Sequence, residues 1–137
     1  LFGEALVILR DELKPDFRFM IKQKGAMLAK GWLLGIQFEE LFQHHLFYEL
    51  ASHANTMAQK LRTALTDCGY FFAYNSQTNQ LFRIFPDTVI EKLAKNFTFN
   101  LGQRIDETHS SIRLVTSWAT TDEGVEEFIQ TLKAITD

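Results

Sequence analysis

The second half of the chain alternates between apolar and polar stretches in the order typical of a small α+β domain. Four segments rich in aromatic and β-branched residues predict strands. These segments are residues 70–74, 80–85, 97–101 and 112–118. Helices are predicted over residues 87–96 and from Thr120 onward. The resulting order is ββαββα, with the helices expected on one face of the sheet.

Two of the predicted helices begin with capping signals. Asp87 follows Pro86 and is expected to cap the first of them. Thr120 and Glu123 match a capping box for the second, whose apolar residues recur at i, i+3, i+4 and i+7. That apolar face comprises Val125, Phe128, Ile129 and Leu132.

The first half of the chain is predicted to be mainly helical. A short apolar run at Leu6–Leu9 predicts a buried strand, and Pro15 suits the first turn of a helix. Residues 16–42 are compatible with a helix, but three small residues interrupt them and favour close packing of the backbone. These are Gly25, Gly31 and Gly35. A long helix is predicted from His45 to Asp67, with Gly69 as its stop.

Composition narrows the class of protein. A hydrophobic content of 46% and a charged content of 23% are typical of a globular domain, and the net charge of −3 does not indicate a nucleic-acid-binding protein. Cys68 is the one cysteine, which excludes an internal disulfide framework and fits a reducing cytoplasm. No apolar window predicts a membrane span, and no signal peptide is visible. The start without Met, in an apparent buried strand, indicates a piece of a longer polypeptide.

Arg113 is the most informative candidate residue because it interrupts an apolar strand. Desolvating its guanidinium without a partner would cost several kcal/mol, and the planar fork suits a carboxylate. The partner is either an internal acid, with Asp106 or Glu107 the nearest candidates, or the carboxylate of a ligand. The residues alone favour an internal ion pair or an arginine that faces solvent.

Other candidates carry weaker signals. Lys22 and Gln23 precede Gly25 and could contact a phosphate, although a solvated basic helix face is favoured. His109 could donate to a ligand, although an exposed turn is favoured. The four histidines lack the spacing of metal ligands, so no metal site is predicted.

Three stretches resemble one enzyme family. They are KQKGAMLAKGWLLGIQF (Lys22–Phe38), SQTNQLFRIFP (Ser76–Pro86) and DETHSSIRLVTSWATTDEGVEEFI (Asp106–Ile129). In order, and over essentially the whole chain, they resemble the C-terminal part of the low-specificity threonine aldolase and aromatic amino acid β-eliminating lyase family. Those enzymes depend on pyridoxal phosphate and have the aspartate-aminotransferase fold, fold type I.

The resemblance implies an overall α/β fold, the C-terminal part of a pyridoxal-phosphate-dependent transferase fold, in which long linking helices precede a small ββαββα domain. Residues 1–42 would end the large cofactor-binding domain and form the first connecting helix. Residues 43–69 would form the interdomain helix, and residues 70–137 the small α+β domain. The expected protein is a cytoplasmic homo-oligomer, a dimer or tetramer, with an amino-acid substrate and no nucleic-acid or membrane partner.

The implied activity is aldol cleavage of the Cα–Cβ bond of a β-hydroxy amino acid, giving glycine and acetaldehyde from threonine. The alternatives are β-elimination on aromatic amino acids, or a non-catalytic α+β module for ligand binding or oligomerisation. Under the resemblance, Arg113 would bind the substrate α-carboxylate with His109 nearby, and Lys22 and Gln23 would lie near the cofactor phosphate. The Schiff-base lysine is expected upstream of Leu1, so no catalytic residue is expected within the chain, which alone would be inactive.

Overall fold

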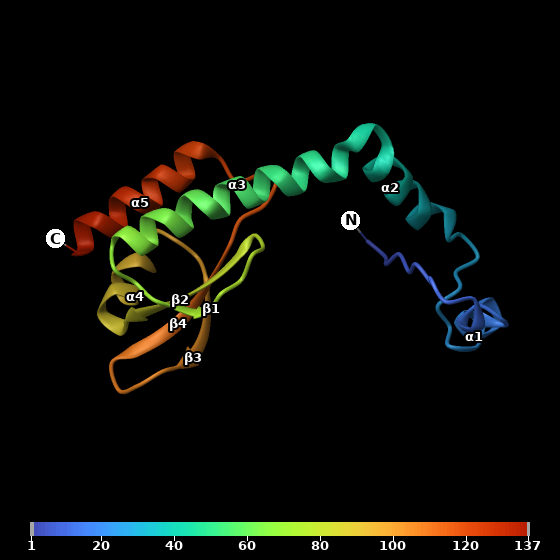
Figure 1. Cartoon of the computed structure of the whole chain (residues 1–137), viewed down its shortest axis with the longest axis horizontal. Helices are drawn as coiled ribbons and strands as arrows, with labels where there is room; N and C mark the ends of the chain where they lie inside the picture. Colours follow the sequence, from blue (N-terminus) through green and yellow to red (C-terminus); the bar gives the residue numbers. More distant parts are fainter. Residues whose placement is uncertain (1, 137) are drawn as a thin grey trace. The chain divides into compact units, whose positions relative to one another are not determined.

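The computed structural model describes residues 2–136 (Figure 1). Its helices are α1 (Phe17–Gln23), α2 (Trp32–Phe42), α3 (Leu46–Asp67), α4 (Asp87–Leu93) and α5 (Asp122–Thr136), with short 3₁₀ turns η1 (Asp11–Leu13) and η2 (Gln43–His45). Its strands are β1 (Phe72–Tyr74), β2 (Gln80–Pro86), β3 (Asn100–Arg104) and β4 (His109–Val115). The chain divides into two compact units between Phe47 and Tyr48. The domain boundaries expected after residues 42 and 69 stay a prediction.

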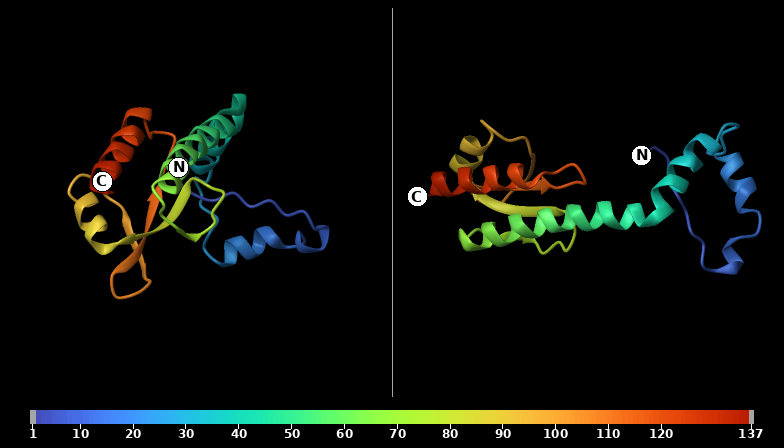
Figure 2. Two further views of the ribbon diagram at one scale, coloured as in Figure 1. Left: turned by 60° about the vertical axis from the view of Figure 1, so that its left-hand side comes forward. Right: turned by 90° about the horizontal axis from the view of Figure 1, so that it is seen from above.

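The C-terminal unit contains a four-stranded antiparallel sheet in the order β1-β2-β4-β3. Helices α3, α4 and α5 share one hydrophobic core with this sheet. Figures 1 and 2 show α3 and α5 side by side over the same face of the sheet. The opposite face, which we call the open face, is not covered by these helices. The predicted order ββαββα, with helices on one face, is therefore confirmed.

The core lies between the sheet and the three helices, and its members recur at helical and strand spacing. The apolar face predicted for α5 packs inward, as does a row of apolar residues of α3. They contribute Ala54, Met57, Leu61 and Leu65 from α3, and Val125, Phe128, Ile129 and Leu132 from α5. Burying each large apolar side chain stabilises the fold by roughly 1.5–3 kcal/mol. This burial holds α3 within the C-terminal unit.

Helix α3 ends at Gly69, as the sequence predicts. The N–H of Gly69 donates to the carbonyl of Thr66 (2.9 Å), and the N–H of Tyr70 donates to that of Leu65 (3.1 Å). This is the Schellman arrangement, and Gly69 has the positive φ of 79° that it requires. Other residues would be strained there, so the glycine fixes where the chain turns into β1.

Two strands differ in position from their predicted ranges. The third is β3, Asn100–Arg104, rather than residues 97–101, and the fourth is β4, His109–Val115, rather than residues 112–118. Phe97 precedes the strand and packs edge-on against Phe128, with ring centroids 5.0 Å apart. The aromatic residues that suggested a strand therefore fill the core, and a more polar segment forms the sheet edge.

Both predicted helix caps are wrong in detail. Asp87 is the first residue of α4, and its carboxylate pairs with Arg104 (3.1 Å) instead of capping the helix. At α5 the cap is Thr121, whose Oγ1 accepts from the N–H of Gly124 (3.1 Å). The hydroxyl of Thr120 accepts from the N–H of Ser117 (2.9 Å), which closes the preceding turn. The helix consequently starts one residue later than the predicted capping box implies.

The N-terminal unit differs most from expectation. Leu6–Leu9 forms no strand, and the side chain of Leu9 is 87% exposed. Gly25 ends α1 with φ of 74°, and a Cβ placed at Gly35 would meet nothing within 4 Å. The predicted close packing through the glycines is therefore absent from residues 2–47, where no side chain is buried. A strand needs a neighbouring strand, and the described part of this unit offers none to Leu6–Leu9.

No helix within residues 2–136 is both long and apolar enough to span a membrane.

Candidate functional site

Arg113 lies near the centre of the open face of the sheet. Its neighbours in β4, Ile112 and Leu114, point into the core and are 0% and 8% exposed, whereas Arg113 is exposed. In register it is paired with Phe82 of β2 on one side and Asn100 of β3 on the other. The predicted alternation of the strand is correct, and it directs the guanidinium away from the core.

The structure pairs Arg113 with neither of its predicted internal partners, Asp106 and Glu107. Asp106 accepts hydrogen bonds from the N–H groups of Thr108 (2.7 Å) and His109 (2.8 Å). Led by the Thr108 bond and then by the His109 side chain, these contacts lower the pKa of Asp106 to about 2. Arg113 is four residues beyond His109, about 14 Å along the strand. Among the described residues it forms no ion pair with Asp106 or Glu107.

His109 shares the open face with Arg113 but is engaged at the other end of β4. Its Nδ1 lies 3.1 Å from a carboxylate oxygen of Asp106 and 3.0 Å from Oγ1 of Thr108. The structure therefore does not bring His109 and Arg113 together, and an α-carboxylate is far smaller than their separation. A substrate-binding role for His109 stays a prediction.

Lys22 and Gln23 lie on the last turn of α1, in the N-terminal unit, and both are exposed. The chain reverses directly after them, because the N–H of Gly25 donates to the carbonyl of Lys22 (3.0 Å). An ammonium and an amide therefore both lie close to a tight turn. Their assignment to a cofactor phosphate stays a prediction.

Other residues of the open face escaped the sequence analysis. Tyr74 contacts Phe82 edge-on, with centroids 5.6 Å apart, and its hydroxyl donates to Oε1 of Gln103 (3.2 Å). The N–H of Gln103 donates to the hydroxyl of Ser111 (2.8 Å). Tyr74 and Gln103 belong to the two outer strands, so their bond spans the open face beside Arg113. Only the strand order and register bring these residues together, and neither is visible in the sequence.

Arg83, which was also missed, is the buried arginine of the sheet. It is 1% exposed and lies on the helix-covered face of β2. Its guanidinium donates to the carbonyls of Arg62 (3.0 Å) and Tyr70, and to the hydroxyl of Thr66 (2.8 Å). Burial, and secondarily the charge of Arg62, lower its pKa to about 10. Arg83 therefore binds the C-terminal end of α3 to the sheet, where the helix dipole favours a cation.

The same alternation that singled out Arg113 could have identified Arg83. In β2 it stands between Leu81 and Phe85, at the spacing that places all three side chains on one face. The cost of desolvating an unpaired guanidinium therefore holds for Arg83 as well, which is paired by backbone carbonyls in place of a carboxylate.

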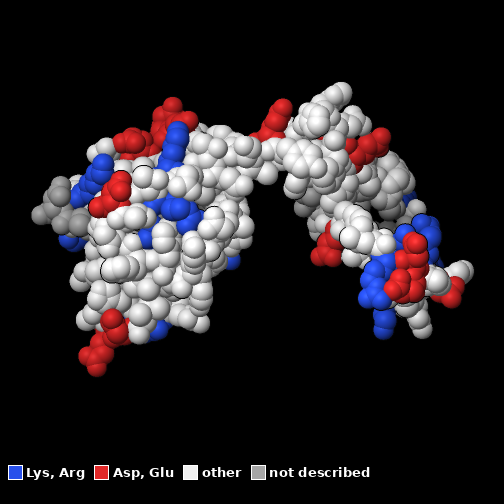
Figure 3. Space-filling view, in the orientation of Figure 1, with Lys and Arg blue, Asp and Glu red and all other residues white. Residues whose placement is uncertain are grey.

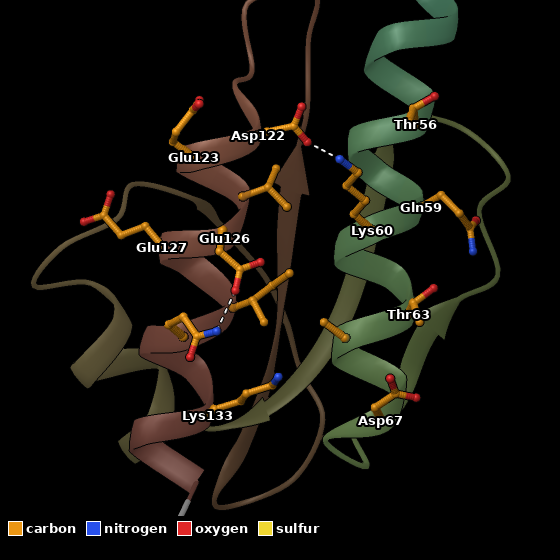
Figure 4. A pocket seen from close by; sticks show the side chains of 14 residues that line it. Thr56, Gln59, Lys60, Thr63, Asp67, Asp122, Glu123, Glu126, Glu127 and Lys133 are labelled. Atoms are coloured by element: carbon orange, nitrogen blue, oxygen red, sulfur yellow. Dashed lines mark hydrogen bonds and ion pairs between the residues drawn. The ribbon is translucent and has the colours of Figure 1, made fainter.

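A groove of about 1150 Å³ lies between α3 and α5, on the helical side of the C-terminal unit (Figure 4). Its apolar lining includes Ala64 and Ile129, and an ion pair between Lys60 and Asp122 joins the two helices at one end. Figure 3 shows acidic and basic side chains mixed along these helices. Arg113 does not line this groove. Arg113 is the stronger candidate because it presents one specific chemistry, a guanidinium fork, whereas the groove mixes acidic and basic side chains.

Comparisons with known proteins agree on one family. Two curated relatives, the low-specificity L-threonine aldolases of Pseudomonas sp. (strain NCIMB 10558) and Pseudomonas aeruginosa, are 26% and 25% identical over 97% of this chain. The solved structure of Leishmania major threonine aldolase is 44% identical over 95% of the chain, with a TM-score of 0.89. The chain is threonine aldolase-like.

The likeness to threonine aldolases covers nearly the whole chain but only 38% of the length of either curated relative or of the Leishmania protein. The serine palmitoyltransferase of Sphingomonas wittichii matches 61% of the chain with a TM-score of 0.50 and 17% identity, which shows the fold alone. No protein-family model matches the sequence. The predicted family resemblance and fold class are confirmed.

Proposed function

We propose that this chain is the C-terminal part of a pyridoxal-phosphate-dependent lyase that cleaves the Cα–Cβ bond of a β-hydroxy amino acid, threonine in the first instance, and that Arg113 binds the substrate α-carboxylate. The likeness to threonine aldolases supports the activity. One observation on the sheet carries the role of Arg113: its guanidinium is exposed, and its in-register neighbours, Phe82 and Asn100, include no acid.

Arg113 suits this role because it is held by a strand whose other face is locked into the core. Its five N–H donors form a planar fork that matches both oxygens of a carboxylate. Binding both oxygens fixes the rotation of the amino acid about its Cα, which is positioning catalysis. The cofactor, when bound, supplies the electron sink for breaking the bond. The work of this chain is therefore orientation of the substrate.

The donors on α1 fit part of such a cofactor. The ammonium of Lys22 is a point charge that suits a phosphate, and the amide of Gln23 adds neutral donors. Both side chains are exposed on one helix turn. These two residues would hold the phosphate, while the lysine that bonds to the cofactor would lie outside residues 1–137. The 137-residue chain alone is then expected to lack turnover.

The proposal includes a homo-oligomer in the cytoplasm. No side chain of residues 2–47 is buried, so the apolar residues of this segment contribute to the surface. Apolar surface of this kind is commonly covered by another part of an assembly. Cys68 is a free thiol, as expected in a reducing compartment.

The direct test is substitution of Arg113 in the full-length lyase supplied with pyridoxal phosphate. Arg113→Lys keeps the charge but loses the fork, so we expect KM for threonine to rise roughly tenfold, and Arg113→Met to raise it roughly a hundredfold. Arg104→Lys is the matched control. Arg104 lies on the same sheet but pairs with Asp87, so this substitution should leave KM unchanged.

Two reactions of the full-length lyase are measured in parallel: release of acetaldehyde from threonine, and release of the side chain from an aromatic amino acid. Turnover of the aromatic amino acid alone would favour β-elimination over aldol cleavage. An unchanged KM in Arg113→Met would refute the carboxylate role of Arg113.

A further inference from the structure

Asn100 is the side chain that the sheet places beside Arg113 on β3. The two residues are in register, and directly opposite residues in an antiparallel pair have Cβ atoms about 4.5–5.5 Å apart. Both lie on the open face and both are exposed. On its other side Arg113 faces Phe82, which offers no hydrogen-bond donor. Of the two in-register neighbours of Arg113, only Asn100 can donate a hydrogen bond.

The chemistry of Asn100 matches that position. Its side-chain amide has two N–H donors, and among residues 2–136 no hydrogen bond engages that amide. It carries no charge, so it leaves the guanidinium free. A carboxylate in its place would form a cross-strand ion pair and occupy Arg113. An amide beside an arginine thus adds a donor without removing the positive charge that attracts the ligand.

We propose that Asn100 is a second carboxylate-binding residue, whose amide donates to the same substrate carboxylate that Arg113 holds. This inference rests on the proposed function. The bond between Tyr74 and Gln103 supports the geometry, because it links the two outer strands across the face on which Asn100 and Arg113 lie.

The first test is kinetic and uses the full-length lyase. Asn100→Ala removes the amide donors and should raise KM for threonine roughly fivefold. Asn100→Asp is nearly isosteric but supplies a competing carboxylate, so it should raise KM further, by roughly tenfold or more. Asn96→Asp makes the same chemical change at an exposed residue before β3 and should leave KM unchanged.

The second test is thermal unfolding, which does not depend on activity. At low salt, Asn100→Asp should raise the Tm when Arg113 is present, because the new carboxylate would pair with the guanidinium. The increase should vanish in an Arg113→Met background and in high salt. Absence of this coupling would overturn the inference, because it would show that the two side chains do not meet.

The two proposals fail in different ways. If Arg113→Met leaves KM unchanged, the carboxylate role of Arg113 is wrong and the inference about Asn100 falls with it. If Arg113→Met raises KM while both Asn100 variants match the Asn96→Asp control, the role of Arg113 stands and the role of Asn100 is refuted. A graded rise in KM from Asn100→Ala to Asn100→Asp, with the coupled Tm, supports both.

Discussion

Arg83 and Arg113 stand on neighbouring strands but face opposite sides of the sheet. Arg83 of β2 is paired in register with Ile112 of β4, the residue before Arg113. The two arginines are therefore offset by one residue in register, which places one of them in the core and the other on the open face. The terminal nitrogens of the Arg83 guanidinium donate to carbonyls and a hydroxyl at and just after the end of α3. The guanidinium of Arg113 is free to bind a ligand. The same side chain therefore serves structure on one face, and on the other face we propose that it serves recognition.

Substituting these two arginines should separate stability from binding. Arg83→Met removes the donors to the end of α3 and leaves partly buried acceptors unpaired, so we expect a loss of about 3 kcal/mol in the free energy of unfolding. Arg113→Met, the matched control on the open face, should change it by less than about 0.5 kcal/mol. Urea unfolding of both variants provides the comparison. Equal losses would mean that Arg83 is not the residue that joins α3 to the sheet.

At the scale of elements, local hydrogen bonds define one end of each of the two longest helices of the C-terminal unit. Gly69 ends α3 with a Schellman turn, and Thr121 starts α5 with a side-chain cap. Between them the core faces of α3 and α5 cover one side of the sheet. The opposite face of the same sheet carries Arg113 between Phe82 and Asn100.

Removing the cap of α5 tests whether the hydroxyl of Thr121 stabilises the start of that helix. Thr121→Ala leaves the N–H of Gly124 without its acceptor and should lower the free energy of unfolding by about 1 kcal/mol. Thr63→Ala is the matched control, since Thr63 is exposed within α3, where alanine is the better helix former. We expect the control to be neutral or slightly stabilising in the same thermal melts. A Thr121→Ala variant as stable as this control would contradict the capping assignment.

At the scale of the whole molecule, the two compact units differ in kind. The C-terminal unit has a continuous core of buried apolar side chains. The N-terminal unit, as far as it is described, has none and exposes residues such as Val7 and Leu9. A unit without a core gains little from burial and depends on surfaces supplied by other parts of an assembly.

The exposed apolar surface should make the 137-residue chain associate. We expect early elution on size exclusion and binding of an apolar dye, because contiguous apolar surface is unfavourable in water. The double variant Val7→Ser, Leu9→Ser should reduce dye binding while leaving the melting of the C-terminal unit unchanged. A sharp monomeric peak without dye binding would count against this.

The sequence by itself determined the local structure of this protein, because helical and strand periodicities, the stop at Gly69 and the alternation around Arg113 depend on neighbours in the chain. It also carried the resemblance to threonine aldolases. Tertiary structure alone decided which arginine is buried, where β3 begins, and that Asn100 and Phe82 flank Arg113. It also separated Asp106 from Arg113. These outcomes depend on strand order and register, which long-range packing sets and which no local pattern encodes.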